Sequence, residues 1–260
     1  MTEDRSSEQD KRPPSVRIAD ELREMIQTGA LASGDKLPSE RDLAQRYGAA
    51  RNTAREAIRL LAQSGLVVAE HGRGVYVRPA NPLIRLGNDR YSHRWRESGL
   101  SPFLAECAKQ GKTGRFEVLS VERMTPPPDV AARLGLAEDS ESVLRRENVF
   151  YADADPVQRV TTWVPWTLAE GTGLLDDEVG HPYGIHGIFE DRGRRMARLQ
   201  EEVSARMPTP DERRRLRLTP GVPVLDVLHT SLDENGDAYE LTRFVMRADL
   251  TGLFYNTPVE

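Results

Sequence analysis

The sequence predicts an α+β protein with two domains, a small helical N-terminal domain and a larger C-terminal domain built around an antiparallel sheet. At 260 residues the chain is long for one domain and a natural length for two. Apolar residues recur at helical spacing in the first quarter of the chain. Strand-like runs separated by turn residues dominate from about residue 116 to residue 246.

Composition excludes several classes of protein. A hydrophobic content of 38% with 30% charged residues is typical of a globular chain. There is no run of 18 apolar residues, so we expect no membrane span. Residues 1–12 are polar, which predicts a disordered tail and not a signal peptide. The single cysteine, Cys107, excludes an internal disulfide. We expect a cytoplasmic protein with no cofactor and no metal.

The net charge of −5 is unevenly distributed. Between Arg41 and Arg59 there are five arginines and two acidic residues, a local charge of +3. An acidic protein with one basic face is compatible with DNA binding, because only that face meets phosphate.

Residues 13–78 read as three helices and a hairpin. Ser15 is the expected N-cap of the first helix, which carries an apolar stripe. Ser39 caps a short second helix that Gly48 ends, and a third helix runs from about Arg51 to Gln63. Two strands, residues 66–68 and 75–77, flank a glycine-rich tip. This is the layout of a winged helix-turn-helix domain, which presents the first turn of its third helix to the major groove.

The residue types in these positions suit DNA reading. Arginine reads guanine and asparagine reads adenine, while a glycine-flanked arginine at the wing tip suits the minor groove. An isolated arginine stripe would favour a solvated face on an ordinary helical bundle, but the turn, the second helix and the wing together favour DNA binding. The predicted DNA-binding residues are Arg41, Arg51, Asn52, Thr53, Arg55, His71, Gly72 and Arg73.

This segment resembles the GntR family of bacterial transcription regulators. The resemblance rests on Leu37-Pro38-Ser39-Glu40-Arg41, on Arg51-x-Thr53-x-Arg55-Glu56-Ala57 and on Gly65-Leu66. It implies operator contacts at Arg41, Arg51, Thr53, Arg55 and the wing residues His71-Gly72. One departure is Ala50, which stands where the family usually has a Ser or Thr N-cap.

Residues 79–99 read as a linker of mixed charge. Its arginines could touch DNA, but a solvated tether is the favoured interpretation; they are Arg85, Arg90, Arg94 and Arg96.

The C-terminal domain, residues 100–258, contains an internal repeat. Residues 128–136 and 210–218 each read as a short helix with a Leu-x-Leu step, followed by a strand and a hairpin turn. Two similar halves predict a pseudo-symmetric sheet with a cleft between them.

This region resembles the UTRA effector domain of the HutC subfamily, whose α/β fold is similar to chorismate lyase. The matching pieces are Asp153-x-Asp155-Pro156-Val157, Thr162-Trp163-Val164-Pro165, Tyr183-Gly184-Ile185, residues 205–210, Gly221-x-Pro223-Val224-Leu225 and Ala248-Asp249. In relatives this domain dimerises and binds a small effector, often an anionic one. Relatives that bind sugar phosphates carry an Arg-x-Arg pair where this chain has Asn148 and Phe150.

The strands supply candidate effector contacts. Arg145 or Arg146 could hold an anion, although a solvated strand face or a dimer-interface ion pair is equally compatible. Thr161 and Trp163 share one strand face, and so do Glu240 and Thr242. The predicted effector-binding residues are Arg145, Arg146, Thr161, Trp163 and Glu240. We interpret His181 and His186 as ordinary loop histidines and not as a metal pair.

Together these features predict a homodimeric, ligand-responsive transcription repressor that is not an enzyme. Its partners would be double-stranded palindromic operator DNA and a small effector, with no membrane. Two alternatives stay open: a second domain that only dimerises, or a bifunctional protein with lyase-like activity.

Overall fold

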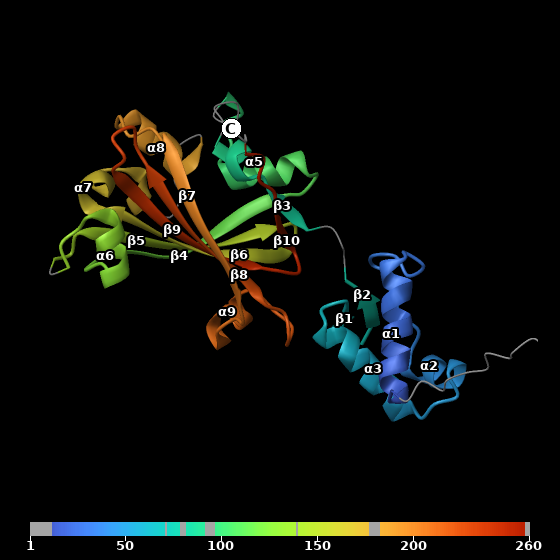
Figure 1. Ribbon diagram of the computed structural model, residues 1–260. Helices are drawn as coiled ribbons and strands as arrows, with labels where there is room; N and C mark the ends of the chain where they lie inside the picture. The colour runs from blue at the N-terminus through green and yellow to red at the C-terminus, as the bar shows by residue number, and fades with distance from the viewer. Residues whose placement is uncertain are drawn as a thin grey trace, which may run out of the picture. The chain divides into compact units, whose positions relative to one another are not determined.

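The computed structural model describes residues 12–70, 72–78, 82–91, 97–138, 140–176 and 183–257. The chain divides into two compact units (Figure 1), one holding the elements up to residue 78 and the other those from residue 82 on. Most of the expected N-terminal tail lies outside the described residues. In the part of the chain that is described, no helix has the length and apolar character needed to cross a membrane.

The first unit has the predicted three helices and hairpin. Its elements are α1 (Pro14–Gln27), α2 (Glu40–Arg46), α3 (Arg51–Gln63), β1 (Val67–Glu70) and β2 (Gly74–Val77). The strands pair antiparallel, and the segment before α2 joins them on the other side of β2. There Leu37 N donates to Val75 O at 2.7 Å and Val77 N donates to Asp35 O at 2.8 Å. This isolated β-bridge ties the wing to the segment that leads into α2.

The ends of the helices are set by local chemistry. Ser39 and Asp42 form a capping box at the start of α2, and Gly48 follows its end with a φ of 58°. The expected N-cap at Ser15 is wrong, since α1 begins at Pro14 and Pro13 takes the cap position without a side-chain bond. Proline suits the first helical position because its fixed φ is helical and no N–H is needed there.

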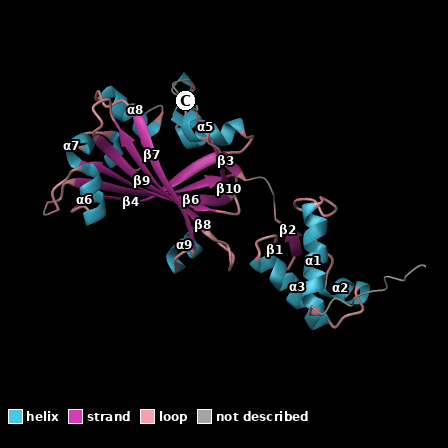
Figure 2. Cartoon of the chain, in the orientation of Figure 1, coloured by secondary structure: helices cyan, strands magenta, loops and turns pink. Residues whose placement is uncertain are grey.

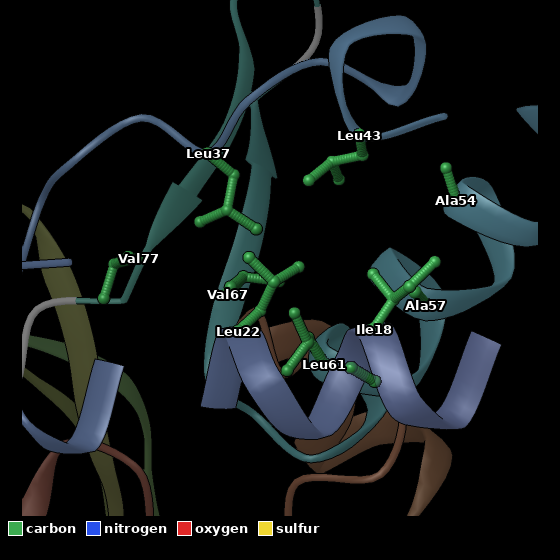
Figure 3. Packing of buried hydrophobic residues seen from close by; sticks show 10 residues of the cluster. Ile18, Leu22, Leu37, Leu43, Ala54, Ala57, Leu61, Val67 and Val77 are labelled. Carbon is green, nitrogen blue, oxygen red and sulfur yellow. The ribbon is translucent and has the colours of Figure 1, made fainter. Parts of the chain in front are cut away.

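One apolar cluster holds this unit together (Figure 3). Ile18 and Leu22 of α1 meet Leu43 of α2, Leu61 of α3 and Val67 of β1, all with almost no exposed surface. Fully burying an aliphatic side chain stabilises the fold by about 1.5–3 kcal/mol. The cluster therefore fixes the angle between α2 and α3.

The second unit is built on a six-stranded antiparallel sheet (Figure 2), as the fold class predicted. Its strands are β4 (Gly114–Met124), β5 (Val143–Ala152), β6 (Asp155–Pro165), β7 (Arg198–Arg206), β8 (Val224–Leu232) and β9 (Ala238–Arg247). Its helices are α5 (Pro102–Lys109), α6 (Pro128–Leu134), α7 (Trp166–Ala169), α8 (Gly184–Asp191) and α9 (Pro210–Arg215), with the 3₁₀ turns η1 (Gly87–Tyr91) and η2 (Gly173–Leu175). A parallel pair, β3 (Leu83–Arg85) and β10 (Thr251–Leu253), completes the unit.

The strand order β4-β5-β6-β9-β8-β7 has the predicted internal symmetry. Each half runs strand, helix, strand, hairpin, strand, with α6 in the first half and α9 in the second. The halves meet where β6 pairs with β9. The strand β7 was not expected, because its polar residues lack an apolar alternation.

Part of the expected linker belongs to the second unit. β3 pairs with β10, and η1 follows directly. Arg85 and Arg90 are buried and ion-paired with Glu201 and Glu106, so they are neither a solvated tether nor available to DNA. Burial of these charges is sustained by their carboxylate partners. Arg94 and Arg96 lie outside the described residues.

Candidate functional site

The start of α3 presents polar side chains to solvent. Arg51 and Asn52 occupy the first turn and are exposed, as is Arg55 one turn later, while Ala54 and Ala57 face the core. The N-cap Ala50 makes no side-chain hydrogen bond. This end of the helix therefore offers its backbone N–H groups and three long polar side chains together, which suits both phosphate and base contacts.

Glu40 at the start of α2 holds two of these arginines. Arg55 donates to both oxygens of Glu40 at 2.9 and 3.0 Å, and Arg51 Nε donates to one of them at 2.9 Å. The hydrogen bond from Arg55, followed by that from Arg51, holds the pKa of Glu40 below its usual value. The guanidinium groups are thus positioned by a neighbouring helix while their outer edges stay exposed.

The other predicted DNA contacts lie on α2, on α3 and at the wing. Arg41 is exposed on the first turn of α2, and Thr53 is half-buried on α3. At the wing, Gly72 and Gly74 adopt φ of 73° and 126°, and Arg73 between them is exposed. His71 lies outside the described residues.

Sequence reasoning missed Lys36. It is exposed, it bridges to Tyr76 of β2, and its Nζ lies 5.9 Å from the Tyr76 ring. Arg73 lies at the same distance from that ring. Lys36 therefore adds a positive charge to the wing from a segment that is distant in sequence, which no local pattern could reveal.

The second unit has a partly open cavity of about 200 Å³ against one face of its sheet. Strands β5, β6 and β9 form the floor, and α5, α8 and η1 form the cover. The cavity spans the seam between the two halves of the sheet, where the repeat predicted a cleft. Its polar lining residues are Arg90, Tyr91, Ser101, Arg146, Asn148, Thr162, His186, Glu240 and Thr242.

A row of polar residues crosses this face of the sheet from β5 to β7. Strand register places Arg146 beside Thr162, Thr162 beside Thr242, Thr242 beside His229 and His229 beside Glu201. We call these five residues the polar row. The hydroxyls of Thr162 and Thr242 lie 2.9 Å apart, and His229 Nδ1 lies 3.0 Å from Glu201 Oε1.

Glu240 ties the polar row to the cavity wall. It accepts hydrogen bonds from Thr242 at 2.7 Å and from Ser231 at 2.9 Å, and Ser231 Oγ lies 3.0 Å from His229 Nε2. Ser231 is fully buried, so its hydroxyl is a member of this chain of hydrogen bonds and not an exposed nucleophile. Tyr91 stacks on His229, with ring centroids 5.3 Å apart, and meets His186 edge-on.

Burial shapes the protonation of these groups. Desolvation, with the charge of Arg90, lowers the pKa of His186 to about 4, although Glu240 opposes this. Burial alone would raise the pKa of Glu201, but the hydrogen bond from His229 and the charge of Arg85 outweigh it and lower that pKa. At neutral pH the cavity therefore faces a neutral His186.

The predicted effector contacts divide between the two faces of the sheet. Arg146 and Glu240 line the cavity. Arg145, Thr161 and Trp163 point to the opposite face, and the cavity is lined by Thr162 in place of its two neighbours. Adjacent residues on a strand face opposite ways, so Arg145 and Arg146 could not both line it.

Arg145 takes part in an ion-pair chain on that opposite face. It pairs with Glu147, which also pairs with Arg159, and Arg159 Nη1 lies 2.8 Å from Asp211 of α9. This chain links the two halves of the domain. His186 lies in α8 and lines the cavity, so its interpretation as a loop residue is wrong; His181 lies outside the described residues.

Comparison with known proteins gives the family. The model of the bacterial regulatory proteins of the gntR family matches residues 14–77, and that of the UTRA domain matches residues 109–251. The chain belongs to the GntR family of transcription regulators, with the UTRA domain predicted from its resemblance to the HutC subfamily.

Individual relatives agree with this assignment. The chain is 31% identical to an HTH-type transcriptional regulator of Streptomyces coelicolor over 236 residues, 88% of this chain and 87% of that protein. It is 26% identical to the HTH-type transcriptional repressor NagR of Bacillus subtilis, covering 91% of each chain. A solved GntR-family regulator matches with a TM-score of 0.62 at 27% identity, covering 96% of this chain and 99% of its own. DNA binding and transcription regulation are thus the activities of this family.

Proposed function

We propose that the protein is a ligand-responsive repressor that acts in the cytoplasm and binds a palindromic operator as a homodimer. The observation that carries the proposal is the first turn of α3, which exposes Arg51 and Asn52 beside Arg55. These are the side-chain types that read guanine and adenine in the major groove. The name of NagR, a repressor, favours repression over activation.

The proposed division of labour follows the two units. Residues 13–78 bind DNA through the eight residues predicted from the sequence, and Lys36 adds a contact at the wing. Residues 100–258 dimerise and bind the effector. In the proposed effector site Arg146 and Glu240 remain lining residues, and Thr162, Asn148 and His186 replace Arg145, Thr161 and Trp163.

The cover of the cavity suggests how ligand binding would affect the DNA-binding unit. Arg90 and Tyr91 of η1 line the cavity, and η1 follows β3, the first strand after the wing in the sequence. A ligand that contacts η1 differently in two conformations shifts the balance between them. Operator affinity would then change by the same differential free energy.

Selection of bound fragments from the source genome tests the proposal, followed by a salt titration and sedimentation on the best fragment. We expect a palindromic site, a 2:1 complex and a steep loss of affinity with salt, because each neutralised phosphate releases counterions. Binding that is indifferent to sequence at every salt concentration would refute the proposed specific repressor. A 1:1 complex on a non-palindromic site would refute the homodimer.

A further inference from the structure

The effector cavity is small. Its volume of about 200 Å³ lies below the range of about 300–1,000 Å³ that holds drug-sized ligands. An apolar cavity of about 150 Å³ accommodates benzene. The space therefore admits one ring with a short substituent.

Aromatic side chains form much of its wall. Phe103, Phe116, Phe150 and Phe244 all line it. Phe150 packs edge-on against Phe103 with centroids 4.9 Å apart, and lies 5.6 Å from Phe116. Clusters of ring edges and faces favour a further aromatic ring, because the positive edge of one ring attracts the negative face of another.

Four polar atoms of lining residues lack a hydrogen-bond partner among the described residues. They are the acceptor Asn148 Oδ1, the donor Arg90 Nε, and Ser101 Oγ and His186 Nδ1. The Asn148 side chain is carried on β5, with 5% of the residue exposed. A buried acceptor without a donor is costly, so a ligand that donates to Asn148 gains affinity from that bond. A hydroxyl or amide both donates and accepts, and can satisfy such groups together.

The charges in the wall disfavour an anion. Arg146 Nη1 already donates to the carbonyl oxygens of Leu174, at 3.0 Å, and Asp176. Arg90 is paired with Glu106. Glu240 adds a buried carboxylate to the same wall. A phosphate here would lose its hydration and meet the like charge of Glu240, while Arg146 is bonded to two backbone carbonyls and the charge of Arg90 is paired with that of Glu106.

We propose that the effector is an uncharged, single-ring aromatic molecule with a hydroxyl or amide group, in place of the anionic effector expected from relatives. This rests on the proposed function, since it assumes that the cavity is the effector site. The ring packs among the phenylalanines and its substituent donates a hydrogen bond to Asn148.

Thermal melting and calorimetric titration of the full chain test the proposal with four probes: phenol, benzamide, toluene and glucose 6-phosphate. We expect phenol and benzamide to raise the melting temperature and to bind more tightly than toluene, because a ligand of the native state stabilises it. Glucose 6-phosphate should leave it unchanged. Tighter binding of glucose 6-phosphate, or equal affinity for phenol and toluene, would overturn the proposal.

Asn148→Leu gives the matched variant. It replaces the amide with an apolar side chain of similar size, so affinity for phenol should fall roughly tenfold while affinity for toluene does not fall. Thr161→Val makes a similar polar-to-apolar change on the opposite face of the sheet and should leave both affinities unchanged. An unchanged phenol affinity in Asn148→Leu would refute the contact. If that variant does not fold, the affinities of the wild-type chain for phenol and toluene still test whether the polar group of the ligand contributes to binding.

Operator release measured with each probe distinguishes failure of the proposed ligand class from failure of the proposed ligand-responsive repressor. If glucose 6-phosphate releases the operator and the aromatic probes do not, the ligand class is refuted while the ligand-responsive repressor stands. If no probe of either class changes melting or operator affinity, and the chain still binds a palindrome, the ligand class is refuted and the ligand response loses its support. If the aromatic probes release the operator, both are supported.

Discussion

Glu40 and Arg55 form a bidentate ion pair between α2 and α3, with both oxygens of the carboxylate engaged at 2.9 and 3.0 Å. The same carboxylate accepts from Arg51. A negatively charged group beside arginines that are proposed to read DNA would repel phosphate, so its presence there is explained best by orientation of the guanidinium groups. Specificity is then gained at the expense of indiscriminate attraction to DNA.

Glu40→Gln tests this role. Removal of the charge should raise affinity for non-specific DNA by roughly two- to fivefold, the scale of one surface ion pair, and should lower discrimination between operator and non-specific DNA. Fluorescence anisotropy on both DNAs at one salt concentration measures the ratio. The matched control is Glu56→Gln, which frees Arg59 instead. Equal loss of discrimination in both variants would assign the effect to net charge alone.

Arg51→Ala should weaken operator binding by about 1–3 kcal/mol and relax the preference at one base position, as expected for a residue that reads a base edge. Binding to a set of operators with single substitutions measures this. Arg214→Ala removes the same charge from an exposed position in α9 and serves as control. Unchanged affinity and base preference in Arg51→Ala would show that the first turn of α3 does not enter the groove.

The sequence predicted the exposed side chains at the start of α3 better than the lining of the cavity, for a physical reason. Arg51, Asn52 and Arg55 act from one helix, so their common exposure follows from helical spacing and the adjacent caps. Glu40 contacts Arg55 from α2, and Lys36 lies beside the wing strand β2, so both positions depend on how other segments pack. Local pattern therefore predicted which side chains of α3 are exposed, and it missed the groups from other segments that surround them.

The cavity depends on register between strands, which local pattern does not contain. Alternation correctly placed Thr161 with Trp163 and Glu240 with Thr242, each pair on one face of its strand. It could not show that Thr162 stands opposite Thr242, which puts Thr161 and Trp163 on the other face. The partners of Arg85 and Arg90 were equally hidden, since Glu201 comes from a polar strand far along the chain.

Ala50→Ser should stabilise the start of α3. Ala50 has the extended conformation of an N-cap, with φ of −69° and ψ of 149°, but no side chain to accept a backbone hydrogen bond. A serine side chain supplies that acceptor, and such an N-cap stabilises the fold by about 0.5–2 kcal/mol. Amide hydrogen exchange at Asn52, the second residue of the helix, should slow accordingly. Ala30→Ser, in an exposed bend, should leave that exchange unchanged. Equal exchange in the two variants would mean that the first turn is already held by other contacts.

The stability of the chain should depend on His186 in mildly acidic solution. Burial lowers its pKa to about 4, against about 6.5 in an unfolded chain. Between these values the unfolded state binds more protons, so the free energy of unfolding falls as pH falls from about 6.5 to 4, by about 3 kcal/mol for this group. Above pH 6.5 the contribution is constant.

Urea unfolding at pH 7, 6 and 5 measures this slope in the wild-type chain and in His186→Gln. The free energy of unfolding of the variant should fall less steeply as the pH is lowered. Acidic groups with lowered pKa values, such as Glu201, still reduce the free energy of unfolding at lower pH. A ring-proton titration by NMR gives a direct check, because the His186 resonance should stay that of a neutral imidazole down to about pH 5. A midpoint near 6.5 would mean that water reaches the ring, and the cavity wall would then be charged in mild acid.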